Sequence, residues 1–214
     1  MKNERRDRRV LAISSLPAVG SAGLKNIIGV LGTRVIPVPS LLISGLGNMA
    51  GHKRFVVPFR DLLHEAMRMA EEQGFELVLY TGYLSTPEQV DDILELIDDY
   101  RHQIHAVVVD PVCGDGGKPY VSENLIHSFD RLLKIADVAT PNRTELALVQ
   151  GLSVENDVSS LIDAFVKRYP SIALITTGVL WEREIGNYLT LGDHTEVLRH
   201  SMEVDRLLSG TGDL

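Results

Sequence analysis

Short apolar runs alternate with longer amphipathic segments along most of this chain. Runs rich in Val, Leu and Ile predict strands over 9–15, 34–39, 76–80, 106–109, 137–140 and 172–177. Between them, apolar residues that recur every three or four positions predict helices over 22–31, 58–74, 86–100, 122–136 and 158–169. This alternation is typical of βαβ units with right-handed crossovers. It predicts an α/β fold with a mostly parallel sheet and helices on both faces.

Three segments depart from this regular pattern. Residues 186–191 and 196–200, joined around Gly192-Asp193, predict a pair of antiparallel strands. The prolines in 34–39 favour an edge strand. Residues 40–57 predict either a flap over a site or an ordinary connecting loop. At the start of the helix over 86–100, Thr86 and Gln89 have the spacing of a capping box.

Composition narrows the class of protein. A chain of 214 residues with 44% hydrophobic residues suits one α/β domain over 9–214, after a disordered basic tail over 1–8. A phosphate-binding arm is the alternative interpretation of this tail. The net charge of −8 disfavours a nucleic-acid partner, and no apolar segment reaches the roughly 20 residues that span a membrane. With a single cysteine, the chain suits the cytoplasm.

The most informative stretch is Asp110-Pro111-Val112-Cys113-Gly114-Asp115-Gly116-Gly117. It follows the apolar strand over 106–109, and ligands of parallel sheets collect beyond the carboxyl ends of strands. Asp110 and Asp115 would both lie there, and carboxylates beside flexible backbone can bind Mg²⁺. The alternative is a plain loop in which Asp caps turns and Gly supplies positive φ.

A second glycine-rich stretch, Gly210-Thr211-Gly212-Asp213, follows near the end of the chain. Its backbone N–H groups are suited to an oxyanion or a phosphate, and Asp213 is suited to accept a proton from an attacking hydroxyl. A simple turn is the alternative. A P-loop is excluded, because Lys118 is followed by Pro119 and position 112 is Val where that motif needs Gly.

Taken together, these motifs resemble those of a known family. The Asp110–Tyr120 stretch, Thr140-Pro141-Asn142-Arg143-Thr144-Glu145 and Gly210-Thr211-Gly212-Asp213 occur in the order seen in ribokinase-like kinases, and within them the chain resembles the pyridoxal (vitamin B6) kinases. The resemblance runs from about Arg9 to the last residue. It implies a three-layer αβα sandwich with a mostly parallel central sheet and a small flap.

The resemblance also implies roles for individual residues. Asp213 would be the catalytic base, with Gly210, Thr211 and Gly212 forming the anion hole. Asp115, with Asp110, Asn142 and Glu145 acting directly or through water, would organise Mg²⁺. Thr140, Thr176 and Thr177 would lie along the ATP phosphates, and Ser15 and Tyr83 would contact the pyridine ring of a B6 vitamer. The implied cofactors are ATP and Mg²⁺, and the implied assembly is a homodimer.

The chain departs from the B6 kinase pattern in places. Leu16 and Leu24 stand where those kinases carry His and Asn, and Ser44-Gly45-Leu46-Gly47 stands for Ser-Asn-His-Thr. We therefore expect a differently shaped substrate pocket, and a hydroxymethylpyrimidine kinase is an alternative. Because the family continues with helices after Asp213, we also expect a C-terminally incomplete domain. A non-catalytic vitamin-binding paralogue is the alternative from another class.

Overall fold

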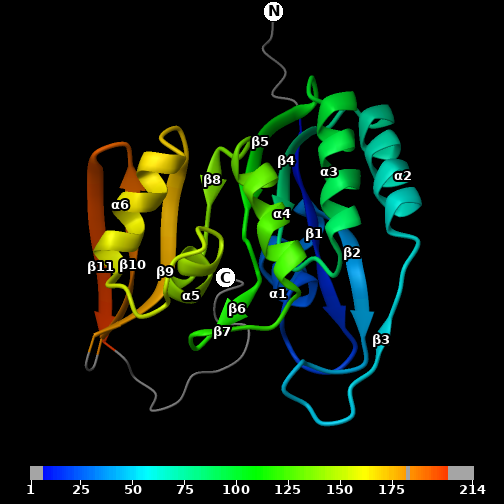
Figure 1. Cartoon of the computed structure of the whole chain (residues 1–214). Coiled ribbons are helices and arrows are strands. Elements are labelled where there is room, and N and C mark those ends of the chain that lie inside the picture. Colours follow the sequence, from blue (N-terminus) through cyan, green and yellow to red (C-terminus); the bar gives the residue numbers. More distant parts are fainter. Residues whose placement is uncertain (1–6, 182–183, 202–214) are drawn as a thin grey trace, which may run out of the picture. The chain divides into compact units, whose positions relative to one another are not determined.

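The computed structural model describes residues 7–181 and 184–201, which fold as two compact units (Figure 1). The first unit includes residues up to Val107, and the second begins at Val108. Strand β5 (Ile104–Val109) contains this boundary, so its first residues belong to one unit and its last residues to the other. Each unit consists of strands with helices packed against them.

The sheet of the first unit is organised around β1 (Arg8–Pro17). This strand lies between β2 (Val35–Ile43) and β4 (Glu76–Thr81) and is parallel to both. The short β3 (Arg54–Phe55) pairs antiparallel with the end of β2. A parallel strand with neighbours on both sides buries both of its faces, which explains why the consecutive residues Leu11, Ala12 and Ile13 are all apolar and fully buried.

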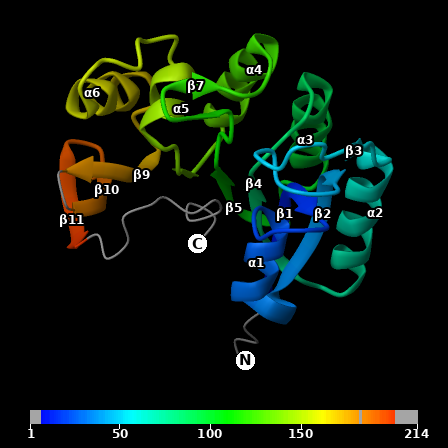
Figure 2. The same ribbon diagram turned by 90° about the horizontal axis from the view of Figure 1, so that it is seen from below.

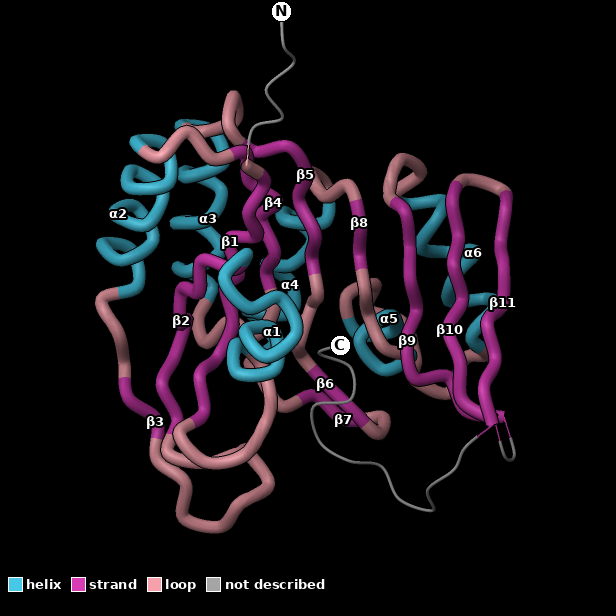
Figure 3. Tube along the Cα trace, turned by 180° about the vertical axis from the view of Figure 1, so that it is seen from behind, coloured by secondary structure: helices cyan, strands magenta, loops and turns pink. Residues whose placement is uncertain are grey.

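Helices cover both faces of this sheet. Helix α1 (Leu24–Leu31) lies on one face, and α2 (Phe59–Glu72) and α3 (Pro87–Asp99) lie on the other (Figures 1 and 3). Helix α1 ends at Gly32, whose φ of 58° lies in the left-handed region that glycine adopts without strain. A short 3₁₀ turn (Gly32–Arg34) then leads into β2. The first unit is therefore built in three layers.

Strand β2 extends past its predicted end and is not simply an edge strand. Its partner β3 pairs with Leu42 and Ile43, beyond Pro37 and Pro39. Strand β3 therefore pairs with β2 only beyond the two prolines. The N–H groups that these prolines lack are not needed for this pairing. The following loop is closed at its base, where the Ser44 and Lys53 backbones are joined by a 2.9 Å hydrogen bond.

The second unit begins as a parallel sheet and ends as an antiparallel one. The end of β5 pairs with β8 (Val138–Ala139), which pairs in parallel with β9 (Ala173–Trp181). Strand β9 is antiparallel to β10 (Glu184–Leu191), and β10 is antiparallel to β11 (His194–Ser201). The predicted late hairpin is confirmed, with Gly192 at its turn in the left-handed region. The predicted α/β class with a mostly parallel sheet is confirmed as well.

Among the residues that the structure describes, three helices and one small hairpin complete the second unit. The helices are α4 (Glu123–Leu133), α5 (Arg143–Leu148) and α6 (Val158–Arg168). The hairpin joins β6 (Gly114–Asp115) to β7 (Lys118–Pro119), and it lies beside α5 (Figure 2). Neither α5 nor the hairpin was predicted as an element. Among the described residues, no helix is both long and apolar enough to cross a bilayer.

Candidate active site

The strand ends of the second unit gather the polar residues that the sequence singles out. Asp110 directly follows β5, and the backbone N–H of Thr140, just after β8, donates to Val109 O at 3.0 Å. The backbone N–H of Thr177, within β9, donates to Pro141 O at 3.1 Å, and Asn142 forms an isolated parallel bridge with Thr177. Asp110, Thr140 and Asn142 thus follow neighbouring strand ends as predicted, whereas β9 continues to Trp181 and its predicted end at Thr177 is wrong.

A reciprocal cap fixes the start of α5. The Asn142 Oδ1 atom accepts from the Glu145 backbone N–H at 2.9 Å, and Glu145 Oε2 accepts from the Asn142 backbone N–H at 2.8 Å. Such a capping box satisfies two N–H groups that a helix start otherwise leaves without partners. It also orients the Glu145 carboxylate inward, where only 3% of the residue is exposed.

The same two side chains bind the Asp110 loop. Asn142 Nδ2 donates to Gly114 O at 2.9 Å, and Glu145 Oε1 accepts from the Cys113 backbone N–H at 3.3 Å. Between the hairpin strands, Gly116 and Gly117 have φ values of 56° and 77°. Two consecutive positive φ angles are typical of the tightest hairpin turns, which is why this turn is Gly-Gly. Asp115 is exposed at the edge of this turn.

Two buried carboxylates dominate the electrostatics of the site. Asp110 is 8% exposed and lies close enough to Glu145 for the two charges to interact. Burial raises the pKa of Glu145 well above the usual range of a carboxyl, and the negative charge of Asp110 raises it further. Burial also raises the pKa of the Cys113 thiol, which keeps this thiol neutral. A cation beside the acidic pair would offset the repulsion.

The donor set fits Mg²⁺ in the form in which kinases bind it. Within residues 7–181 and 184–201, no three or more His, Cys, Asp or Glu side chains cluster as a metal cage. Mg²⁺ in phosphoryl-transfer sites commonly uses one or two carboxylates and completes its shell with water and substrate phosphates. The buried pair Asp110 and Glu145, whose mutual repulsion a cation would relieve, fits that arrangement.

The three candidate threonines differ in their surroundings. Thr140 and Thr177 are partly exposed, whereas Thr176 is fully buried and its hydroxyl has no hydrogen-bond partner in the described structure. Successive strand residues point to opposite faces, so Thr176 and Thr177 cannot line the same surface. Of these two neighbours, Thr177 is the one placed to reach a ligand.

The predicted ring-binding residues belong to the first unit. Ser15 is partly buried near the end of β1, and Tyr83 follows the end of β4. Tight packing brings their loops together within this unit. A Cβ on Gly23 would lie 2.4 Å from Ser15 O, and one on Gly82 would lie 2.9 Å from Ser14 Oγ. Only glycine allows these close approaches.

Buried polar side chains that the sequence analysis missed hold the Tyr83 backbone. Ser14 Oγ accepts from the Tyr83 N–H at 3.2 Å, and Ser40 Oγ donates to Tyr83 O at 2.5 Å. Gln89 then links the two sides of the loop: Oε1 accepts from the Ser85 N–H and Nε2 donates to Ser40 O, both at 2.8 Å. Nothing in the local sequence of Ser40 indicates this contact, which spans 43 residues.

The predicted capping box at Thr86 and Gln89 is wrong. Helix α3 does begin after Thr86, but this residue makes no side-chain cap. Gln89 is buried, and its amide binds Ser85 and the main chain of Ser40, as described above. Ser85, the residue before Thr86, therefore takes the Gln89 oxygen that a capping box would need, and Ser40 takes the amide nitrogen.

Two of the departures from the resembled pattern are packing residues. Leu24 is fully buried in a cluster with Ala12 and Ile27, and Leu16 packs against that cluster. A third, Leu46, lies over Gly20, so that a Cβ on Gly20 would be 2.5 Å from Leu46 Cγ. Leu16 and Leu24 therefore contribute to the contact between β1 and α1.

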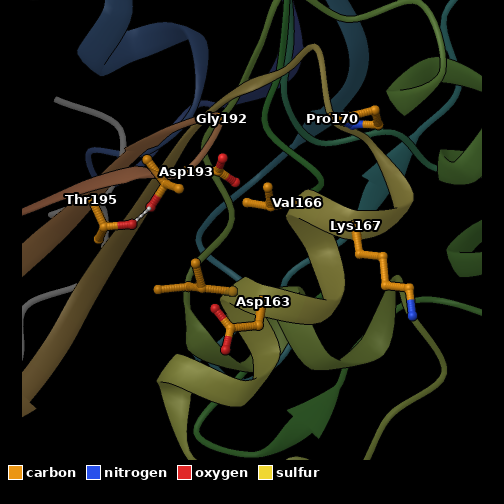
Figure 4. Close-up of a pocket in the computed structure, with 9 residues that line it drawn as sticks. Asp163, Val166, Lys167, Pro170, Gly192, Asp193 and Thr195 are labelled. Carbon is orange, nitrogen blue, oxygen red and sulfur yellow. Dashed lines mark hydrogen bonds between the residues drawn. The ribbon is translucent and has the colours of Figure 1, made fainter.

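One cavity of about 480 Å³ lies elsewhere in the second unit, between α6 and the β10–β11 turn (Figure 4). Asp163 and Lys167 of α6 and Asp193 and Thr195 of the hairpin contribute to its lining. None of the candidate site residues that the structure describes lines it. Gly210, Thr211, Gly212 and Asp213 lie outside the described residues.

The chain is similar in sequence to known kinases. A family model described as phosphomethylpyrimidine kinase matches residues 48–214. A pyridoxal kinase of Arabidopsis thaliana is 30% identical, over 96% of this chain and 71% of that protein.

Two solved structures share the fold. One is a phosphomethylpyrimidine kinase homologue from Bacteroides thetaiotaomicron, crystallised with pyridoxal, with a TM-score of 0.81 and 22% identity over 96% of this chain and 76% of that one. The other is an ADP complex of Bacillus subtilis pyridoxal kinase, with a TM-score of 0.79 and 20% identity over 96% and 79% of the two chains. From the family model and the Arabidopsis relative, the chain belongs to the pyridoxal and phosphomethylpyrimidine kinase family, within the ribokinase-like superfamily.

Proposed function

We propose that this protein phosphorylates the hydroxymethyl group of pyridoxal, pyridoxine or pyridoxamine with ATP, a reaction of vitamin B6 salvage. The observation that carries this proposal is the grouping of Asp110, Asn142, Glu145 and the glycine hairpin at the ends of parallel strands. Phosphoryl transfer needs chiefly positioning and charge neutralisation, and this grouping offers both. The pyridoxal kinase relatives support the choice of substrate.

Within the second unit, each residue has a distinct task. Asp110, Asp115 and Glu145 would hold Mg²⁺, which supplies neutralisation of phosphate charge. Thr140 and Thr177 would bind phosphate oxygens from partly exposed positions, with Thr176 buried behind them. Asn142 would keep the Asp110 loop in place through its hydrogen bond to Gly114 O.

At the acceptor side, Ser15 and Tyr83 would bind the pyridine ring. Asp213 would accept the proton of the hydroxymethyl group. The hydroxymethyl oxygen would then attack the γ-phosphorus, and the bond between the γ-phosphorus and the oxygen that bridges it to the β-phosphate would break. The backbone N–H groups of Gly210, Thr211 and Gly212 would stabilise the negative charge on the transferred group.

The test is ADP formation with Mg²⁺ and each of four acceptors: pyridoxal, pyridoxine, pyridoxamine and hydroxymethylpyrimidine. We expect ADP formation that requires both Mg²⁺ and a B6 vitamer and is lost in Asp213→Asn. Turnover with hydroxymethylpyrimidine alone would favour the second candidate function, which the description of the matching family model supports. Pyridoxal binding without turnover would contradict the kinase activity and favour a non-catalytic vitamin-binding protein.

The assembly and the compartment are further parts of this proposal. By resemblance, we propose a cytoplasmic homodimer. Light scattering after gel filtration would then give twice the chain mass of 23.6 kDa. A mass equal to that of one chain would contradict the dimer and leave the proposed reaction untouched.

A further inference from the structure

The β6–β7 hairpin carries Asp115 but is too small to hold itself in place. Each strand has two residues, paired as Gly114 with Pro119 and Asp115 with Lys118. Pro119 has no N–H to contribute to the ladder. Isolated hairpins are marginal even when they are longer, so this one depends on contacts with its surroundings.

Helix α5 supplies those contacts from its first turn. Asn142 and Glu145 bind the base of the loop, at Gly114 O and at the Cys113 N–H. Thr144 binds the far side of the turn, because its Oγ1 accepts from the Gly117 backbone N–H at 3.0 Å. Asp115 lies between these two points of attachment.

The Thr144 side chain is well placed to act on Asp115. The residue is 7% exposed, and its methyl group faces the hairpin, since a Cβ on Gly114 would lie 3.2 Å from Thr144 Cγ2. The Asp115 carboxylate is itself bound to the turn, where Oδ1 accepts from the Gly116 N–H at 2.8 Å. A turn that loses its attachment at Gly117 would therefore carry the carboxylate with it.

We propose that Thr144 is a positioning residue, whose hydroxyl fixes the glycine turn and thereby holds the Asp115 carboxylate in place for magnesium-bound nucleotide. The role assigned to Asp115 rests on the proposed function. Thr144 belongs to the motif Thr140-Pro141-Asn142-Arg143-Thr144-Glu145, but the roles implied by the resemblance do not include it.

The first experiment measures amide hydrogen exchange in the apo protein. Thr144→Val keeps the side-chain shape and removes the acceptor, whereas Thr144→Ser keeps the hydroxyl. We expect exchange at Gly117 to be roughly three- to tenfold faster in Thr144→Val, as for the loss of one hydrogen bond, and close to wild type in Thr144→Ser. The exposed Thr33→Val is the matched control, with no change at Gly117. Unchanged exchange in Thr144→Val would overturn the proposal.

The second experiment asks whether Thr144 acts through Asp115. Binding of Mg·ADP is measured by calorimetry in wild type, Thr144→Val, Asp115→Asn and the double variant. We expect Thr144→Val to weaken binding about tenfold when Asp115 is present and by less than twofold when it is Asn, as for coupled neighbours. Equal weakening in both backgrounds would indicate a merely structural role and overturn the proposal, as would a wild type that does not bind Mg·ADP.

The two experiments separate this inference from the proposed function. Faster exchange at Gly117 together with coupled binding of Mg·ADP would support the role of Thr144, even if no B6 vitamer were phosphorylated. In that case only the proposed reaction would fail. Turnover of pyridoxal with unchanged exchange at Gly117 would support the proposed reaction and overturn the role of Thr144.

Discussion

The side chain of Asn142 joins two elements, because its two polar atoms have different partners. Its Oδ1 caps α5, and its Nδ2 binds Gly114 O in the Asp110 loop. Removing it therefore affects the helix and the loop together. Each remaining partner would also be left without its hydrogen bond in a part-buried place, which costs more than the bond itself contributes.

We expect Asn142→Ala to lower the free energy of unfolding by about 1–2 kcal/mol, mainly through the lost helix cap. Urea denaturation monitored by circular dichroism measures this change. The control is Asn124→Ala, at an exposed position in α4, which should change the free energy by less than about 0.5 kcal/mol. Equal losses in the two variants would show that the cap contributes little.

Ser40 holds the backbone of Tyr83, which is proposed to bind the pyridine ring of the substrate. Ser40→Ala removes the hydrogen bond to Tyr83 O, and a bond of about 1 kcal/mol corresponds to roughly a fivefold change in an equilibrium. We expect a rise of that size in KM for pyridoxal and no change in KM for ATP. Steady-state kinetics with each substrate varied in turn provides the measurement, and the exposed Ser159→Ala is the control. A parallel rise in both KM values would argue against this role.

At the scale of elements, the contact between the hairpin and α5 depends on a glycine. A Cβ on Gly114 would lie 2.6 Å from Leu148 Cδ1 and 2.8 Å from the backbone oxygen of Lys118. The leucine can move, but the backbone oxygen belongs to the paired strand. To accept even a methyl group, β6 and β7 would therefore have to move apart, in addition to the shift of the leucine.

We therefore expect Gly114→Ala to lower the free energy of unfolding by about 1–3 kcal/mol, as for overpacking of a filled interior. Gly29→Ala is the matched control, since Gly29 lies within α1 and a Cβ there meets nothing within 4 Å. In a helix interior, this exchange should raise stability by about 0.5–1 kcal/mol. Chemical denaturation of both variants would contradict the packing argument if the two shifts had the same sign.

Most elements that the sequence predicted are long enough to show a period, and the two-residue β8, predicted over 137–140, is an exception. Helices α2, α3, α4 and α6 and strands β1, β4 and β9 could all be predicted from their apolar spacing. Helix α5 has six residues, too few for a helical period, although the Asn142 to Glu145 spacing is a local signal for its start. The two-residue strands β6 and β7 show no alternation, and only the Gly-Gly pair indicates their turn.

Some residues of the candidate site could likewise be placed from the sequence, and others could not. Asp110, Thr140 and Asn142 could be placed at one sheet edge because they follow parallel strands in sequence. Ser40 and Gln89 could not, because their partners lie far away along the chain and depend on the packing of the whole unit. Alternation along a strand could have shown that Thr176 and Thr177 face opposite ways, but not that Thr176 is the buried one.

At the scale of the whole molecule, Asp130 links stability to pH. Its carboxylate accepts from Arg168 at 2.6 Å and from the Tyr169 hydroxyl at 2.7 Å, and it pairs with Lys134 at 2.7 Å. Burial raises the pKa of Asp130, but hydrogen bonds from Lys134, Tyr169 and Arg168 outweigh it and lower the pKa from 3.8 to about 2. The group thereby joins α4 to the end of α6.

The sign of the effect follows from this shift. A pKa that is lower in the folded state favours folding above the unfolded value, and this contribution is lost as pH falls from about 4 to about 2. We expect the Asp130→Asn variant to be roughly 2 kcal/mol less stable than wild type at pH 6, with the difference narrowing toward pH 2. Urea denaturation of both proteins across this range measures it. A difference that stays constant with pH would exclude the charge as its cause.

The contact between Gly20 and Leu46 places a constraint on how this protein and its homologues evolve. Since a Cβ at position 20 would lie 2.5 Å from Leu46 Cγ, a side chain at that position requires Leu46 to move aside or to be replaced by a smaller residue. Gly20 also has a φ of 95°, which disfavours any replacement. Across an alignment of homologues, the two positions should therefore covary: lineages that replace the glycine should carry a small residue in place of the leucine, and single replacements should be rare.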